Sequence, residues 1–303
     1  MNVSMVSFDE ADPLLTWSGL TDALEAGHLR PKAEIADSFL YRGDDTVLSR
    51  AAWIDGVGQT VKTATIFPGN EAKGLSKIHG AVTLFSDETG QLEAVIDFHL
   101  VTKWKTAGDS LLAAKRLARP DSKRFLILGA GTVAANMISA YRSHWPDAEI
   151  TIWTRNAEKG ATFADAQGVG FNADLEAAVT VADVICTATM STAPVLKGAW
   201  LQPGQHVDMI GAYRPDMRET DDDALGRARL FVDSYDTTLD HIGELKIPLA
   251  AGVISPRDVV ASFYEPERFQ RGSDDEITIC KNGGGAHLDL MTSRYILNTW
   301  SAR

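Results

Sequence analysis

Residues 124–141 read RFLILGAGTVAANMISAY, and this stretch decides the fold. RFLIL is typical of a buried strand, and the residues after Gly131 have the periodicity of a helix. The turn between them has the pattern G-x-G-x-x-A. Gly129 permits a tight turn, Gly131 permits close approach of a phosphate group, and Ala134 permits close packing of helix and strand. The stretch therefore predicts a dinucleotide site, with Gly129, Ala130, Gly131, Thr132 and Val133 as cofactor-binding residues.

The chain after residue 120 alternates between strand-like and helix-like segments. Strands are expected at RFLIL, EITIWT, VGF, DVICTA, HVDMIG and LFVD, with helices such as 133–144 and 158–166 between them. This alternation is typical of parallel βαβ units. We therefore predict an α/β protein with a Rossmann dinucleotide-binding domain over residues 121–284.

The chain before residue 121 has a different texture. Short β-rich runs separated by turn residues between positions 46 and 97 indicate an antiparallel meander, and residues 100–118 have the spacing of a long helix that ends before Pro120. A last strand, ITICK, precedes a helix near the C-terminus. These segments predict a smaller α+β domain, formed by residues 1–120 and joined by a helix at 285–303.

Composition narrows the class of protein. The chain has 303 residues, 45% of them hydrophobic, and its 29 basic and 41 acidic residues give a formal charge of −12. This charge disfavours nucleic acid and anionic membranes as partners. We expect neither a membrane-spanning segment nor a signal peptide, and hence a cytoplasmic protein. The two cysteines, Cys186 and Cys280, exclude a disulfide framework and a cysteine-rich zinc site, and we expect no metal.

The end of the second strand bears on the choice of cofactor. A site selective for NAD carries an acidic residue there, whereas this chain has Thr154, Arg155 and Asn156. An arginine can pair with a 2′-phosphate, and no carboxylate repels it. We therefore expect NADPH to be preferred, with NADH possible; the alternative is an exposed arginine on a loop.

Two lysines occur at unusual positions. Lys62 lies in the apolar strand VKTATIF, and Lys105 lies in the helical segment VTKWKTAGDS beside small residues. An unpaired ammonium is costly to bury, so together these lysines could hold a small carboxylate. For each lysine taken alone, an aliphatic stem along apolar surface with its head in water explains the position equally well.

Several motifs in order resemble the ornithine cyclodeaminase/mu-crystallin family. They are KTATIFPGN from Lys62, then GLSKIHGAVTLFSDETG, then the helix around Lys105, then the GAGTVA turn, ADVICTATMSTAPVL and KNGGGAHLDL. The resemblance implies that Lys62 and Lys105 are the catalytic residues that bind the substrate carboxylate. It also implies that Arg42 is a third member of the clamp, and that His79 lies near the substrate as a relay or a structural histidine. The further cofactor positions that it implies are Thr106, Arg155, Thr187, Ala188 and Thr189.

Two departures from the family pattern matter. Lys105 stands where the family often has an arginine, so a point charge replaces a bidentate clamp. The cyclodeaminases carry an aspartate in G-A-D-x-P-G-K, whereas residues 211–219 here read GAYRPDMRE. Tyr213 cannot replace a carboxylate in binding an ammonium group, and this form resembles the ketimine reductases.

The resemblance implies a function. We expect NAD(P)H-dependent reduction of Δ1-pyrroline-2-carboxylate, or of Δ1-piperideine-2-carboxylate, to L-proline or L-pipecolate by a homodimer. The resemblance implies that the domain of residues 1–120 and 285–303 binds the substrate and forms the dimer. Ornithine cyclodeaminase and alanine dehydrogenase activities are the enzymatic alternatives. A mu-crystallin-like protein that binds NADPH and a hydrophobic carboxylate without turnover is the alternative of another class.

Overall fold

The computed structural model describes residues 3–303 and divides the chain into two compact units. The first unit is Met1–Lys105 with Gly284–Arg303, and the second unit is Thr106–Gly283. The boundary between the units was expected after residue 120. In the structure it lies inside helix α3 (Phe98–Leu117), between Lys105 and Thr106. Polar contacts explain the difference: Asn282 of the second unit donates to Asp109 at 2.9 Å and accepts from Ser110 at 3.2 Å, so the second half of α3 belongs with that unit.

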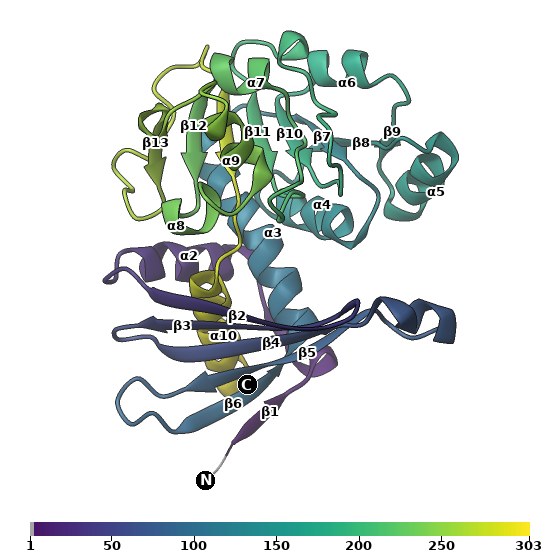
Figure 1. Cartoon of the computed structure of the whole chain (residues 1–303). Helices are drawn as coiled ribbons and strands as arrows, with labels where there is room; N and C mark the ends of the chain where they lie inside the picture. The colour runs from purple at the N-terminus through teal and green to yellow at the C-terminus, as the bar shows by residue number, and fades with distance from the viewer. Residues whose placement is uncertain (1–2) are drawn as a thin grey trace. The chain divides into compact units, whose positions relative to one another are not determined.

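The first unit is built on a six-stranded sheet (Figure 1). Its strands, in spatial order, are β1 (Ser4–Val6), β6 (Leu92–Asp97), β5 (Ile78–Phe85), β4 (Gly58–Ile66), β3 (Asp45–Ile54) and β2 (Glu34–Arg42). Strands β2 to β6 pair antiparallel in sequence order, and β1 adds to β6 in parallel. The predicted meander is confirmed, and β1 and β2 extend it at its two edges.

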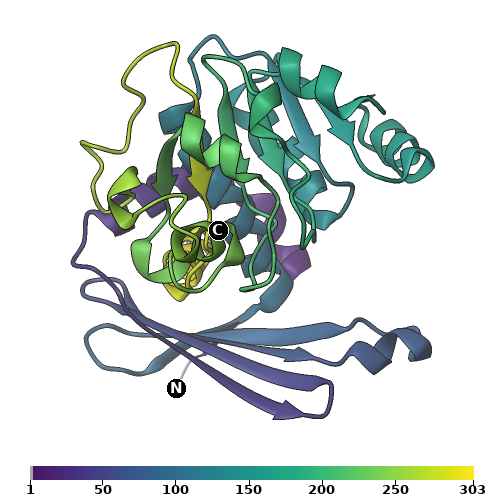
Figure 2. The same cartoon turned by 45° about the horizontal axis from the view of Figure 1, so that its top comes forward.

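Helices cover one face of this sheet. The first unit contains α1 (Phe8–Ala11), η1 (Asp12–Leu14), α2 (Trp17–His28), η2 (Pro68–Lys73), the start of α3 and α10 (Ala286–Ser301). Helix α10 packs on β3, β4 and α2 (Figures 1 and 2). Side chains alternate between the faces of a strand, so Lys62, Val82 and Ile96, which are register partners on adjacent strands, share the face that α10 covers.

The second unit contains an eight-stranded parallel sheet. In spatial order its strands are β13 (Val259–Ser262), β12 (Arg229–Val232), β14 (Thr278–Lys281), β11 (His206–Met209), β10 (Val184–Thr187), β7 (Arg124–Leu128), β8 (Glu149–Trp153) and β9 (Gly170–Phe171). The order reverses between β7 and β10, and right-handed crossovers then place helices on both faces of the sheet. The Rossmann-type α/β fold predicted from residues 124–141 is confirmed. Strand β13 was not among the predicted strands.

The helices of this unit pack on opposite faces of strand β7. The unit includes α4 (Thr132–His144), α5 (Ala157–Gln167), α6 (Leu175–Val181), η3 (Gly198–Trp200), α7 (Asp222–Arg227), α8 (Tyr235–Thr238), α9 (Gly243–Ala250) and η4 (Pro256–Asp258). Phe125 meets Tyr141 of α4 with ring centroids 4.9 Å apart, whereas the neighbouring Leu126 belongs to the apolar cluster that contains Val179 of α6. Both faces of β7 are thus buried, which explains its continuous apolar run.

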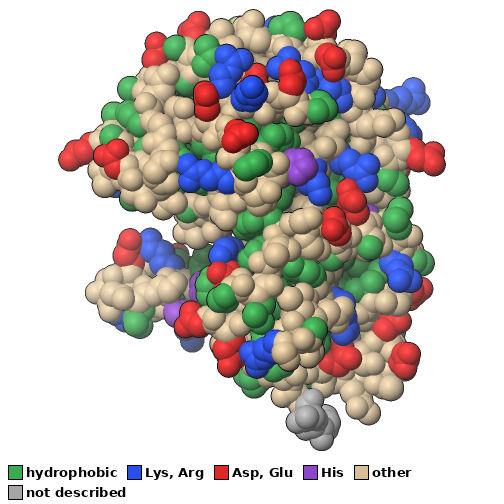
Figure 3. Space-filling model, turned by 180° about the vertical axis from the view of Figure 1, so that it is seen from behind, with side chains coloured by type: hydrophobic (Ala, Val, Ile, Leu, Met, Phe, Trp, Pro, Cys, Tyr) green, Lys and Arg blue, Asp and Glu red, His purple; other side chains and the backbone are tan. Residues whose placement is uncertain are grey.

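On the face shown in Figure 3, acidic and basic side chains are interspersed. Among residues 3–303, no helix has the length and apolar character needed to cross a bilayer.

Candidate functional site

A buried ion pair lies at the centre of the first unit. Lys62 of β4 places Nζ 2.9 Å from Asp289 Oδ1 of α10, with side-chain exposures of 8% and 0%. The same Nζ lies 4.7 Å from the centroid of the Phe98 ring. Burial lowers the pKa of Lys62 to about 8, against the opposing effect of Asp289. A lysine in such a setting is held by its partner and is poised to bind an anion.

Two further cations converge on one backbone oxygen beside this pair. Lys105 Nζ donates to the carbonyl of Gly284 at 2.5 Å, and Arg50 Nη1 donates to the same carbonyl at 3.0 Å. Arg50 is also the register partner of Lys62 on the neighbouring strand, and it pairs with Asp37 at 3.0 Å. Both Lys62 and Lys105 are 7% exposed. We call Arg50, Lys62, Lys105 and Asp289 the cation cluster.

The structure places two of the predicted substrate residues apart from the cation cluster. Arg42 ends strand β2, has a side chain that is 81% exposed and pairs with Asp45 across the hairpin at 3.0 Å. His79 is an exposed residue of β5 whose register partner is Thr65. Since direct partners share a face, the register puts both residues on the face of the sheet opposite to Lys62. Neither belongs to the cation cluster, and Arg50 takes the place that was expected for Arg42.

The predicted dinucleotide turn has the required geometry in the second unit. Gly129 has φ +133°, and a Cβ there would lie 2.5 Å from the carbonyl oxygen of Ala188 on the adjacent strand. Gly131 precedes α4 without a side-chain cap, and a Cβ there would meet nothing within 4 Å. Ala134 is fully buried, as close packing of helix and strand requires. The open N-terminus of α4 fits a pyrophosphate, with Ala130, Thr132 and Val133 around the turn.

The residues expected at the adenosine end lie directly after β8. Thr154 is half-buried, and Arg155 and Asn156 are exposed. The Asn156 side chain accepts a hydrogen bond from the backbone N–H of Lys159 at 2.9 Å and so caps α5. This hydrogen bond occupies the side-chain oxygen of Asn156. Arg155 is the one cation among these three residues, and it is exposed.

The threonines at the end of β10 are tied to a carboxylate that the sequence did not single out. Glu219 is fully buried and accepts five hydrogen bonds, from the Thr187 hydroxyl, the Thr189 backbone and hydroxyl, and the backbone N–H groups of Gly211 and Ala212. The Thr187 and Thr189 hydroxyls therefore hold the loop at the strand end, which leaves Ala188 on the open side of the turn. Thr106 is half-buried in α3.

Tyr213 lies on an exposed loop after β11. Its side chain is 58% exposed, and the Arg214 guanidinium lies 5.7 Å from its ring centroid. The nearby Asp216 is engaged by Arg214, with Nε to Oδ1 at 2.9 Å. Because Glu219 is buried with its hydrogen bonds made, neither acidic side chain near Tyr213 is free to receive an ammonium group.

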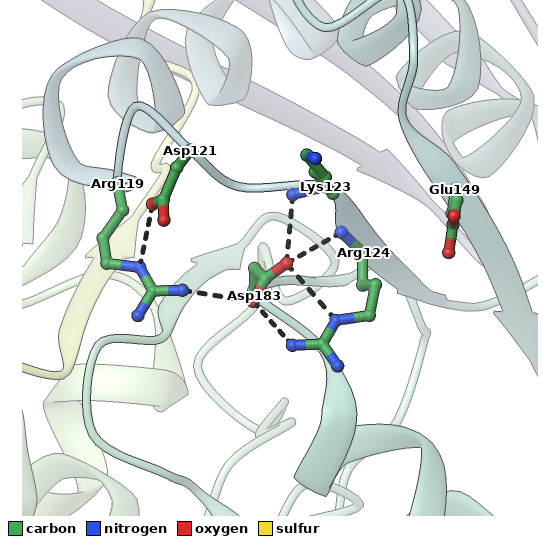
Figure 4. A pocket seen from close by; sticks show the side chains of 6 residues that line it. All are labelled: Arg119, Asp121, Lys123, Arg124, Glu149 and Asp183. Carbon is green, nitrogen blue, oxygen red and sulfur yellow. Dashed lines mark hydrogen bonds and ion pairs between the residues drawn. The ribbon is translucent and has the colours of Figure 1, made fainter.

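A polar pocket of about 390 Å³ lies at the end of the parallel sheet away from the glycine turn, where strands β7 and β10 begin (Figure 4). Asp183 is its centre, because it accepts from the backbone N–H groups of Lys123 and Arg124 at 3.0 and 2.9 Å and pairs with Arg124 and Arg119. Burial would raise the pKa of Asp183, but these donors hold it below its usual value. The pocket lies at the amino ends of β7 and β10, whereas ligands of such sheets bind at the carboxyl ends, so we assign it a structural role.

Sequence reasoning missed Arg50 and Asp289. Arg50 lies in a β-run, but only the strand register reveals that it faces Lys62. Asp289 belongs to the KNGGGAHLDL motif, where it is the single acidic residue among apolar residues of a helix. A carboxylate at such a position needs a partner, and this was the available signal.

Comparison with known proteins identifies the family. A profile of the ornithine cyclodeaminase/mu-crystallin family matches residues 51–303, and the chain belongs to this family. It is 47% identical over 300 residues to Delta(1)-pyrroline-2-carboxylate reductase of Paracoccus denitrificans, with 96% of this chain and 95% of that protein covered.

Two solved structures have the same fold. An archaeal alanine dehydrogenase dimer with bound NAD is 28% identical, with a TM-score of 0.89 and coverage of 100% of this chain and 97% of that one. Delta(1)-pyrroline-2-carboxylate reductase of Thermococcus litoralis, in complex with NADH and L-proline, is 24% identical, with a TM-score of 0.88 and coverage of 98% and 97%.

Proposed function

We propose that this chain is an oxidoreductase that reduces cyclic imino acids, Δ1-pyrroline-2-carboxylate or Δ1-piperideine-2-carboxylate, to L-proline or L-pipecolate. The convergence of Arg50, Lys62 and Lys105 within the first unit carries the proposal. The 47% identity to a Delta(1)-pyrroline-2-carboxylate reductase over nearly the whole of both chains supports it.

The chain's own residues would bind and orient the substrate. Lys62 and Lys105, together with Arg50, would hold its carboxylate through charge-assisted hydrogen bonds. The glycine turn and the N-terminus of α4 would hold the pyrophosphate of a nicotinamide dinucleotide, which supplies a hydride to C2 of the imine when it is bound. A protonated imine is already electrophilic, so no nucleophile or metal is needed. Positioning by the cation cluster then provides most of the remaining barrier reduction.

The cofactor and the assembly are further parts of the proposal. Arg155, with no acidic residue beside it at the end of β8, favours NADPH over NADH. The archaeal relative with the same fold is a dimer with bound NAD, which supports a dinucleotide cofactor and a homodimer here. The two buried free thiols, Cys186 and Cys280, fit a reducing compartment such as the cytoplasm.

Ornithine cyclodeaminase activity is the alternative that the loop after β11 disfavours. Ring closure of ornithine needs a carboxylate to hold the distal amine, but Tyr213 stands at that position and Asp216 is paired with Arg214. A ring-closed imine has no distal amine to bind. Alanine dehydrogenase activity would use the same cation cluster with pyruvate and ammonia, and a binding protein would show no turnover.

A substrate panel tests the proposal. NADPH and NADH oxidation are followed by absorbance with pyrroline-2-carboxylate, with piperideine-2-carboxylate and with pyruvate plus ammonia, and ammonia release is measured from L-ornithine with NAD⁺. We expect rapid oxidation with the cyclic imines, faster with NADPH than with NADH, and no ammonia from ornithine. Proline formation from ornithine, or the absence of turnover with both imines, would contradict the proposal.

A further inference from the structure

The two carboxylate oxygens of Asp289 differ in their contacts. Asp289 Oδ1 accepts from Lys62 at 2.9 Å, whereas Oδ2 is buried and has no hydrogen-bond partner among residues 3–303. The side chain is fully buried and its hydrogen bond is made to Lys62. Its contact with the site is made through the ammonium of Lys62.

Charged groups face Lys62 from three elements. Asp289 approaches from α10, Lys105 from α3 and Arg50 from β3, and Arg50 is itself paired with Asp37 of β2. Strand β5 contributes Val82, the apolar register partner of Lys62. Among these groups Asp289 alone favours the charged form of the lysine, while burial, Lys105 and Arg50 oppose it.

These contacts give Asp289 a definite task. Burial would raise its own pKa, but Lys62, Lys105 and Arg50 hold that pKa below its usual value, so Asp289 stays ionised. An ionised Asp289 stabilises the ammonium of Lys62 by charge and by a hydrogen bond. Lys62 must be charged to bind a carboxylate, and its pKa of about 8 leaves a narrow margin above neutral pH.

We propose that Asp289 is a positioning residue that keeps Lys62 charged and directed at the substrate carboxylate, and that it thereby sets the upper pH limit of substrate binding. This inference rests on the proposed function, because it assigns Lys62 to the carboxylate.

Binding of pyrrole-2-carboxylate, a planar carboxylate that does not titrate between pH 6 and 10, provides a test that does not depend on turnover. With saturating NADP⁺, we expect its Kd for the native protein to rise about tenfold per pH unit above pH 8. In Asp289→Asn the rise should begin about one pH unit or more lower, because an opposite charge in contact shifts a pKa by roughly 1 to 3 units. Below pH 6 the two proteins should differ little.

Asp37→Asn is the matched control. It removes the carboxylate that pairs with Arg50, whose guanidinium stays charged throughout this pH range, so the pH at which Kd begins to rise should not move. In Lys62→Arg the Kd should not rise below pH 10, because an arginine stays charged in this range. This result would assign the rise in Kd of the native protein to Lys62.

Two outcomes would overturn the inference. The first is a loss of binding in Asp289→Asn that is equal at every pH, as a purely structural role predicts. The second is a pH limit that stays near 8. If Asp289→Asn does not fold, Asp289→Glu keeps the charge and should keep the limit within about half a pH unit of the native value, and a larger shift would then reject the role. Failure of the native protein to reduce any cyclic imine would reject the proposed function instead.

Discussion

At the scale of single residues, the balance of charge in the cation cluster defines its ligand. Its three cations, Arg50, Lys62 and Lys105, are accompanied by two carboxylates, Asp289 within the cluster and Asp37, which pairs with Arg50 from β2. One net positive charge remains among these five groups. Buried charges are tolerated when they are paired, so one carboxylate group completes the set. This balance suits a substrate with a single carboxylate such as a cyclic imino acid.

Arg50 and Arg42 form a natural pair for a test. We expect Arg50→Gln to lower kcat/KM for pyrroline-2-carboxylate by roughly tenfold to a hundredfold, mainly through KM, because a charge-assisted hydrogen bond is worth about 1.5 to 3 kcal/mol. Arg42→Gln removes an exposed arginine whose surface ion pair contributes at most about 1 kcal/mol to stability, so steady-state kinetics should change less than about twofold. Equal effects of the two substitutions would remove Arg50 from the substrate site.

The candidate site could be predicted in part from single residues. Lys62 and Lys105 stood out because a lysine in an apolar run must have a reason to be there. Arg42 and His79 lie apart from the cation cluster because the face that a strand residue occupies depends on strand parity, and a shift of one residue moves a side chain to the other face. Arg50 was missed for the same reason, because no local sequence pattern indicates which residues of two neighbouring strands lie opposite each other.

At the scale of elements, the turn between β7 and α4 shows two different demands on glycine. Gly129 adopts φ +133° and packs its Cα against Ala188, so its conformation serves the fold. Gly131 is exposed, with open space beside it, so its lack of a side chain serves a ligand. The same motif thus contains one glycine for stability and one for binding.

Substitution by alanine separates these two demands. Gly129→Ala should lower the free energy of unfolding by about 1 to 3 kcal/mol, since it forces an L residue into a strained conformation against a backbone oxygen. Gly131→Ala should leave that free energy within about 0.5 kcal/mol of the native value and weaken NADPH binding at least roughly tenfold. Chemical denaturation and fluorescence titration measure the two quantities. A Gly131→Ala protein that binds NADPH normally would contradict the assigned role of the turn.

The elements themselves were largely predictable where their period was strong. Strands β7 and β10, with continuous apolar runs, and the long helix α3 were expected close to their observed bounds. Strand β2 was missed because it is an edge strand with most of its residues exposed, and no burial pattern marks it. Strand β13 occupies the other sheet's edge and is only four residues long.

At the scale of the whole molecule, the chain crosses between its two units at two points, and residues of the site lie at both. Lys105 is the last residue of the first unit at one crossing, and Gly284, whose carbonyl accepts from Lys105, is the first at the other. The cation cluster therefore belongs to the first unit, and the contact from Lys105 to Gly284 lies where the chain leaves that unit and returns to it.

The face of the six-stranded sheet opposite to α10 bears on how two copies of the chain would assemble. Val61 alternates with Lys62 and points away from α10, on the same face as Ala51 and Thr83, where side chains are half-exposed although they are small or apolar. A second copy of the chain would bury this face, and each substitution would occur twice in such a symmetric interface. We therefore expect Val61→Glu to convert a dimer into a folded monomer at micromolar concentration, because burying an unpaired carboxylate costs several kcal/mol. Val181→Glu, on an exposed position of α6, is the matched control and should remain dimeric. Analytical ultracentrifugation distinguishes the two states, and a Val61→Glu protein that stays dimeric would show that the copies meet through another surface.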